Sequence, residues 1–227
     1  TCIMEKTAIV LGATGLTGRH LVDELLRNNN YTKVSLFSRS KLGKVHAKLE
    51  EHLIDVLKLE SHKEAFKAHD VFCCIGTTKA KTPDKEKYKK IDYGIPVTAA
   101  KLAAKNGAEC FVVISAMGAD ANSRIFYNRI KGEMEQDVMV ANIPNIYIFR
   151  PALIVGDRKE KRIFENVAMQ AFKLFNFILV GNLKKYRSVK SHNIAKAMMQ
   201  VANFWYSDAV IKSDKINELA AKYDARN

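Results

Sequence analysis

The chain has little of what secreted and membrane proteins rely on. It contains four cysteines in 227 residues, and Cys73 and Cys74 stand side by side in an apolar run. That placement is typical of a core and argues against a disulfide framework or a cysteine metal site. No window offers about 18 uninterrupted apolar residues, so we expect no membrane span. The short apolar start does not resemble a signal peptide. Together these absences predict a cytoplasmic protein that carries no metal.

Acidic residues are also few for the number of bases. Lys and Arg total 37 against 24 Asp and Glu, which gives a formal net charge of +13. The bases are scattered over residues 41–48, 79–90, 158–162 and 184–190. They come with no nucleic-acid motif and no interleaved aromatics, although charge alone would allow a nucleic-acid partner. A solvated basic surface that steers an anionic cofactor is the favoured interpretation.

The pattern of apolar runs predicts an α/β protein. Strands are expected at residues 7–11, 34–38, 52–56, 70–75, 110–115 and 146–150, and helices at 17–28, 61–67, 92–105, 126–141 and 193–204. Near-continuous apolar strands are typical of a parallel sheet that is buried on both faces. We expect a Rossmann-type doubly wound sheet with helices on both faces. Residues 1–227 would form one domain, in which 152–227 add a small C-terminal cap and the last helices.

A glycine-rich turn follows the first expected strand. Gly12, Gly15 and Gly18 are spaced Gly-x-x-Gly-x-x-Gly between an apolar run and a helical pattern. In that context glycines let the backbone approach a pyrophosphate, and the amides at the helix start meet its charge. The turn predicts a dinucleotide site; a purely structural tight turn is the alternative.

The end of the second expected strand bears on the choice of cofactor. Ser38 and Arg39 stand 20 and 21 residues after Gly18, where an NAD site usually carries an acid for the ribose 2′-hydroxyl. A guanidinium there can instead grip a 2′-phosphate in bidentate fashion. Arg39, with Lys41 nearby, favours NADP over NAD; an exposed arginine at a strand end is the alternative.

Two further strand ends carry weaker signals. Gly76 and Thr77 are small and polar residues after the fourth strand, and they would leave room for a cofactor ribose. Asp55 and Val56 follow the third strand and would face the adenine. Ordinary loop positions explain all four equally well.

A tyrosine and a lysine lie four residues apart in the helix expected at 126–141. Tyr127 and Lys131 would share one helix face, and Ser115 ends the fifth strand 12 residues earlier. The lysine ammonium would favour the phenolate and hold a nicotinamide ribose, while the tyrosine acts as general acid toward a carbonyl. The serine would hydrogen-bond the substrate oxygen. A pair on the helix surface is the alternative.

These motifs resemble the short-chain dehydrogenase/reductases, and more narrowly the atypical Tat-interacting-protein-like group. The shared-looking segments are residues 12–18, 73–78, 115–120, 127–131 and 149–152. The resemblance implies that Thr14, Gly15, Leu16 and Thr17 contact the pyrophosphate and that Arg39 contacts the adenosine phosphate. It also implies a catalytic trio of Ser115, Tyr127 and Lys131. Pro151 would begin the loop over the nicotinamide.

One position departs from the family pattern. Asp92 stands where many short-chain dehydrogenases use a catalytic asparagine. The group also includes regulators that bind NADPH. The sequence therefore favours an NADP(H)-dependent oxidoreductase that acts on a small carbonyl or alcohol. An NADPH-sensing regulatory or scaffold protein with little turnover is the alternative. The apolar stretch 163–180 would pack in the core or serve as a protein-binding or homo-oligomer face.

Overall fold

A seven-stranded parallel sheet forms the centre of the molecule. The computed structural model describes residues 5–156 and 188–226. In spatial order the strands are β3 (Leu49–Leu53), β2 (Tyr31–Ser38), β1 (Lys6–Leu11), β4 (Asp70–Cys73), β5 (Cys110–Ile114), β6 (Asn145–Arg150) and β9 (Val210–Lys212). The order reverses between β1 and β4, which is the topological switch point of a doubly wound fold. The expected Rossmann-type sheet is confirmed. The stretch 163–180 lies outside the described residues.

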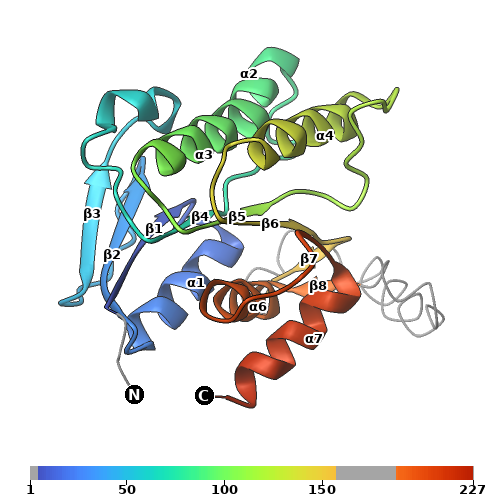
Figure 1. Ribbon diagram of the computed structural model, residues 1–227. Coiled ribbons are helices and arrows are strands. Elements are labelled where there is room, and N and C mark those ends of the chain that lie inside the picture. Colours follow the sequence, from blue (N-terminus) through green and yellow to red (C-terminus); the bar gives the residue numbers. More distant parts are fainter. Residues whose placement is uncertain (1–4, 157–187, 227) are drawn as a thin grey trace.

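Helices cover both faces of the sheet (Figure 1). One face carries α1 (Leu16–Arg27), α6 (Ser191–Asn203) and α7 (Ser213–Asp224). The other carries the 3₁₀ helix η1 (Val56–His62), α3 (Ile95–Lys105) and α4 (Phe126–Met139). Two short strands, β7 (Ile154–Val155) and β8 (Val189–Lys190), pair separately from the main sheet. The expected helix at 193–204 is α6.

Strand β1 shows why the strand sequences are apolar throughout. Ala8 and Val10 belong to the core beneath α1 and α6, whereas Ile9 and Leu11 belong to the core beneath α3. Successive side chains of a strand point to opposite faces, so a strand between two helical layers must be apolar at every position.

Two expectations near the edge strand were wrong. The strand expected at 52–56 is β3, which ends at Leu53, and the helix expected at 61–67 does not form. The Asp55 carboxylate accepts a hydrogen bond from Leu57 N (3.1 Å) and caps η1. Such a local side-chain bond favours a helix start over strand continuation.

The connection from β4 to α3 is helical over most of its length. A short helix, α2 (Lys85–Lys89), continues into one π-helical stretch, η2 (Lys90–Gly94), and then into α3. The expected helix at 92–105 therefore begins earlier. A π-helical turn rotates the residues that follow it, and such turns occur often at functional sites. Here it carries the fully buried Asp92.

Candidate active site

A cavity of about 420 Å³ opens at the carboxyl ends of the strands around the switch point. Open α/β sheets bind ligands at this place. Its lining includes nine of the predicted cofactor residues: Gly12, Thr14, Gly15, Ser38, Arg39, Asp55, Val56, Gly76 and Thr77. The structure thus brings together residues from the ends of β1, β2, β3 and β4.

The glycine turn forms the floor of the cavity. Gly12 has φ +81°, and a Cβ there would lie 2.8 Å from the Cys74 carbonyl carbon. A Cβ on Gly18 would lie 2.1 Å from the Gly12 oxygen. Gly15 N donates to that same oxygen at 3.0 Å, and Gly15 itself is exposed in the cavity. Two glycines therefore close the turn, and the middle one leaves open backbone next to the start of α1. Leu16, Thr17 and Gly18 continue into the helix and do not line the cavity.

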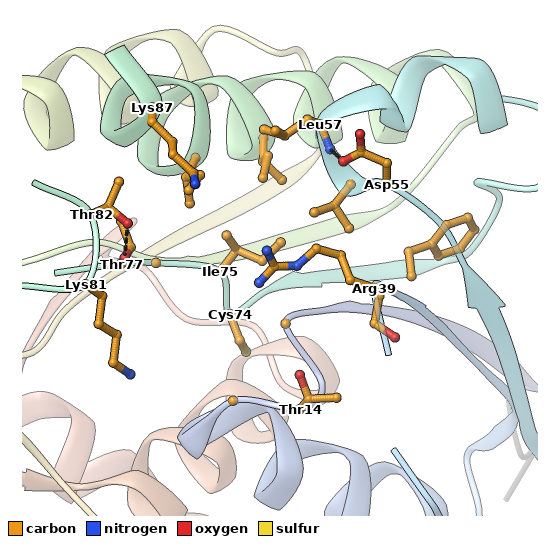
Figure 2. A pocket seen from close by; sticks show the side chains of 18 residues that line it. Thr14, Arg39, Asp55, Leu57, Cys74, Ile75, Thr77, Lys81, Thr82 and Lys87 are labelled. Atoms are coloured by element: carbon orange, nitrogen blue, oxygen red, sulfur yellow. Dashed lines mark hydrogen bonds between the residues drawn. The ribbon is translucent and has the colours of Figure 1, made fainter. Parts of the chain in front are cut away.

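Arg39 reaches into the cavity from the end of β2. Figure 2 shows its guanidinium extending toward Ile75, across the space above the glycine turn. Ser38 lies beside it, with its hydroxyl donating to Ser40 O at 2.7 Å. Asp55 lines the same wall, but its carboxylate is engaged at the start of η1. The arginine side chain is exposed and presents its guanidinium to the cavity.

The loop after β4 is tied to the buried Asp92. Thr77 N donates to Asp92 Oδ2 at 2.9 Å. The other carboxylate oxygen, Oδ1, lies 2.8 Å from Lys131 Nζ. That contact pairs the charges without the alignment of a hydrogen bond. A carboxylate buried this deeply requires a cationic partner, and Lys131 on α4 supplies it.

Lys131 lies where it would reach a ligand beside Gly76. Its side chain is 8% exposed, and Nζ donates to Ile114 O at 3.4 Å. A Cβ on Gly76 would lie 3.9 Å from Nζ, so the ammonium borders the cavity without being part of its lining. A small residue at position 76 keeps the space over the lysine open.

Tyr127 packs in a small aromatic cluster. Its ring makes edge contacts with Tyr88 at 4.7 Å and Phe126 at 5.4 Å between centroids. Burial, with the charge of Asp92 nearby, raises the pKa of Tyr88 and keeps that phenol neutral. The structure places Tyr127 on the same helix as Lys131, but the ion pair of the lysine is with Asp92.

Ser115 contributes a buried hydroxyl without a partner. Its backbone N donates to Phe149 O at 2.7 Å, which fixes it directly after β5. Its Oγ makes no hydrogen bond within the described residues. A buried hydroxyl in this position is able to hydrogen-bond a water molecule or a ligand. Pro151 is buried after β6, where its carbonyl accepts from Met117 N at 3.2 Å, and it does not line the cavity.

Sequence reasoning missed one wall of the cavity. Lys81, Thr82 and Lys87 line it, although the lysine-rich stretch 79–90 was expected to be a solvated surface. Ile91 and Ile95 complete that side. The density of lysines directly after the fourth strand was the available signal, because that strand ends at the switch point.

Within residues 5–156 and 188–226, no helix is long and apolar enough to cross a membrane. The same residues contain no cluster of three or more His, Cys, Asp or Glu that could hold a metal ion.

Comparison with known proteins identifies the family. Residues 12–145, more than half of the chain, match the model of an NAD(P)H-binding family. Protein HTATIP2 of Rattus norvegicus is 34% identical over 174 residues, covering 75% of this chain and 72% of the relative. Protein FMP52, mitochondrial, of Debaryomyces hansenii is 30% identical over 204 residues, covering 87% and 88%. The expected resemblance to the Tat-interacting-protein-like group is confirmed.

Solved structures agree on the fold. The Bordetella bronchiseptica enzyme WbmG in complex with NAD superposes with a TM-score of 0.66 at 14% identity, covering 97% of this chain and 78% of that enzyme.

The names of the relatives correct one expectation: several are called mitochondrial, which contradicts a cytoplasmic protein. The fold, the cavity at the switch point and these relatives lead to one conclusion: the chain belongs to the NAD(P)H-binding family, in the group that includes HTATIP2 and FMP52.

Proposed function

We propose that this protein is an NADP(H)-dependent oxidoreductase of the short-chain dehydrogenase/reductase type. The observation that carries the proposal is the cavity itself, which runs from the open backbone at Gly15 to the guanidinium of Arg39. One end offers free amides at a helix start for a diphosphate, and the other offers a bidentate cation for a 2′-phosphate.

The residues present fit a dinucleotide. Gly15 lines the cavity and is exposed, so its bare backbone is suited to close approach by a phosphate. Thr14 and Gly15 would hold the diphosphate, Ser38 and Arg39 the adenosine end, and Gly76 with Lys131 the nicotinamide ribose. When bound, NADPH supplies a hydride to a carbonyl carbon.

The protein side chains would handle the proton and the substrate oxygen. Ser115 Oγ is buried and makes no hydrogen bond to any residue in 5–156 or 188–226, so it is suited to hydrogen-bond a carbonyl oxygen. Tyr127 would donate its phenolic proton to that oxygen as general acid. Lys131 places a cation at the ends of β4 and β5, where it stabilises developing negative charge. Asp92 fixes the lysine through their ion pair.

The pairing of Lys131 with Asp92 also supports a second candidate function. The buried carboxylate of Asp92 offsets the positive charge of Lys131 on which the proposed reduction depends. An NADPH-binding regulator would bind the cofactor in the same cavity and would transfer little or no hydride to a substrate.

The first test measures cofactor preference. NADPH should bind more tightly than NADH, by about ten- to a hundredfold, because a bidentate charged contact contributes about 1.5–3 kcal/mol. Arg39→Asp should erase or reverse the preference. Lys58→Asp, which removes an exposed cation nearby on η1 without touching the cavity, should leave it unchanged. Equal affinity of the unaltered protein for both cofactors would contradict the assignment.

The second test separates the two functions. A panel of small carbonyl compounds is supplied with NADPH, and its oxidation is followed by absorbance. If the protein is an enzyme, Tyr127→Phe abolishes oxidation and leaves NADPH affinity almost intact. Tight NADPH binding with no turnover of any compound in the panel would support the regulator instead.

A further inference from the structure

Five of the six lysines in the segment between β4 and α3 fall into two sets. Six lysines lie between residues 79 and 90. The ammonium groups of three of them lie over aromatic rings: Lys79 over Tyr127 at 6.0 Å, Lys85 over Phe126 at 5.6 Å and Lys89 over Tyr93 at 5.6 Å. Lys81 and Lys87 instead line the cavity. Only these two of the six lysines therefore line the cavity.

Local hydrogen bonds hold the two cavity lysines in place. Lys81 N donates to Thr78 O at 3.0 Å, and Lys87 N donates to Asp84 Oδ1 at 2.6 Å. The hydroxyls of Thr77 and Thr82 bond to each other at 2.9 Å, next to Lys81. The Thr77 amide is itself anchored on the buried Asp92. These hydrogen bonds fix the course of the backbone that carries the two lysines.

The two lysines face Arg39 across the cavity. Figure 2 shows Lys81 and Lys87 on one side and the guanidinium of Arg39 entering from the other. The lining includes one carboxylate, Asp55, whose oxygen already accepts the Leu57 amide. Three cations against one engaged acid give the cavity a net positive field that favours a ligand with several negative charges.

We propose that Lys81 and Lys87 form a second phosphate-binding wall, opposite Arg39. The inference rests on the proposed function and extends it: Thr14 and Gly15 hold the diphosphate at the glycine turn, and the two lysines neutralise phosphate oxygens from the wall that faces Arg39. Lysine acts as a point charge toward phosphate, so this wall adds affinity without the geometric selectivity of Arg39. The phosphate groups belong either to the dinucleotide or to a phosphorylated substrate bound beside it.

The test compares two double variants of the same segment. Lys81→Ala with Lys87→Ala should weaken the binding of both NADPH and NADH by about tenfold, because two charge-assisted contacts at exposed sites contribute about 1.4 kcal/mol in total. Lys85→Ala with Lys89→Ala removes the same charge from the aromatic set and should change affinity by less than about twofold. The cavity variant should also show a flatter dependence of affinity on salt. Affinities of the cavity variant that match the parent for both cofactors would overturn the wall as a cofactor contact.

Inorganic diphosphate distinguishes the source of the phosphate. If NADPH displaces diphosphate from the parent, and the cavity variant binds diphosphate more weakly than the parent does, the wall holds phosphates of the cofactor. If the NADPH-saturated parent still binds diphosphate and the cavity variant does not, the wall holds a phosphorylated substrate. The proposal is refuted if the cavity variant binds NADPH and diphosphate as tightly as the parent does. A parent that binds neither cofactor would instead refute the proposed function.

Discussion

At the scale of single residues, two glycines of the turn after β1, Gly15 and Gly18, differ in how well they tolerate substitution. A Cβ on Gly18 would overlap the Gly12 oxygen at 2.1 Å, whereas a Cβ on Gly15 would lie 3.2 Å from it. Gly18 is buried where α1 begins, and Gly15 is exposed. Gly18 lets α1 pack closely against the turn, whereas Gly15 lines the cavity.

Substitutions at the two glycines should therefore separate folding from binding. Gly18→Ala should destabilise the protein by about 3 kcal/mol, because backbone must move to accept the methyl group. Gly15→Val should change stability by less than about 1 kcal/mol and abolish NADPH binding. Urea denaturation and cofactor titration measure the two effects. A folded Gly15→Val variant with unchanged NADPH affinity would show that the site assignment is wrong.

At the scale of elements, the ion pair of Asp92 and Lys131 joins η2 to α4. Helix α4 packs closely against the loop after β5, where a Cβ on Gly132 would lie 2.1 Å from Ala121 N. Lys131 thereby reaches both the buried carboxylate on η2 and the end of β5. The position of the predicted catalytic lysine depends on two elements that are distant in sequence.

A double-mutant cycle should reveal this coupling. Asp92→Asn and Lys131→Met should each cost about 3 kcal/mol, because each leaves a buried charge unpaired, and the double variant should cost less than their sum. The pair Arg129 and Glu133 on the same helix, 3.8 Å apart and partly exposed, is the matched control. Its coupling should be no more than about 0.5 kcal/mol in urea denaturation. Equal coupling for the two pairs would argue against a structural role for Asp92.

At the scale of the whole molecule, a second buried polar cluster lies at the opposite end of the sheet from the cavity. Lys6 Nζ contacts Asp70 Oδ2 at 2.6 Å, and Tyr31 donates its hydroxyl to the same oxygen. Burial raises the pKa of the Asp70 carboxyl and, together with the charge of Asp70, raises the pKa of Tyr31 well above 10.0. This cluster ties β1, β2 and β4 together at their amino ends.

The raised pKa of Tyr31 predicts a loss of stability in alkali. Below pH 10 both the folded and the unfolded chain hold the phenolic proton, and the contribution to stability is fully present. Above pH 10 the unfolded chain releases it first, so the free energy of unfolding falls by about 1.4 kcal/mol per pH unit for this group. Tyr31→Phe should lower stability at pH 8 but flatten its decline between pH 10 and 11. Parallel declines in urea denaturation of the two proteins would contradict the assignment.

The sequence by itself determined the sheet and much of the cofactor cavity. Apolar runs such as 7–11 and 110–115 must be buried on both faces, and their alternation with helices leaves the doubly wound sheet as the arrangement that buries them. Glycine spacing and strand ends are local features. They were enough to predict that Gly12, Gly15, Arg39 and Gly76 gather at one edge, as they do.

Only the tertiary structure decided which charged groups face the cavity and which partner each one takes. Lys81 and Lys85 are indistinguishable in a lysine-rich run, and the packing of aromatic rings from α4 separates them. The pairing of Lys131 with Asp92 likewise depends on a π-helical turn and on how closely α4 is seated. Spacing along one helix predicts which residues share a face, but the partner of a buried charge is set by contacts between elements, where desolvation decides the pairing.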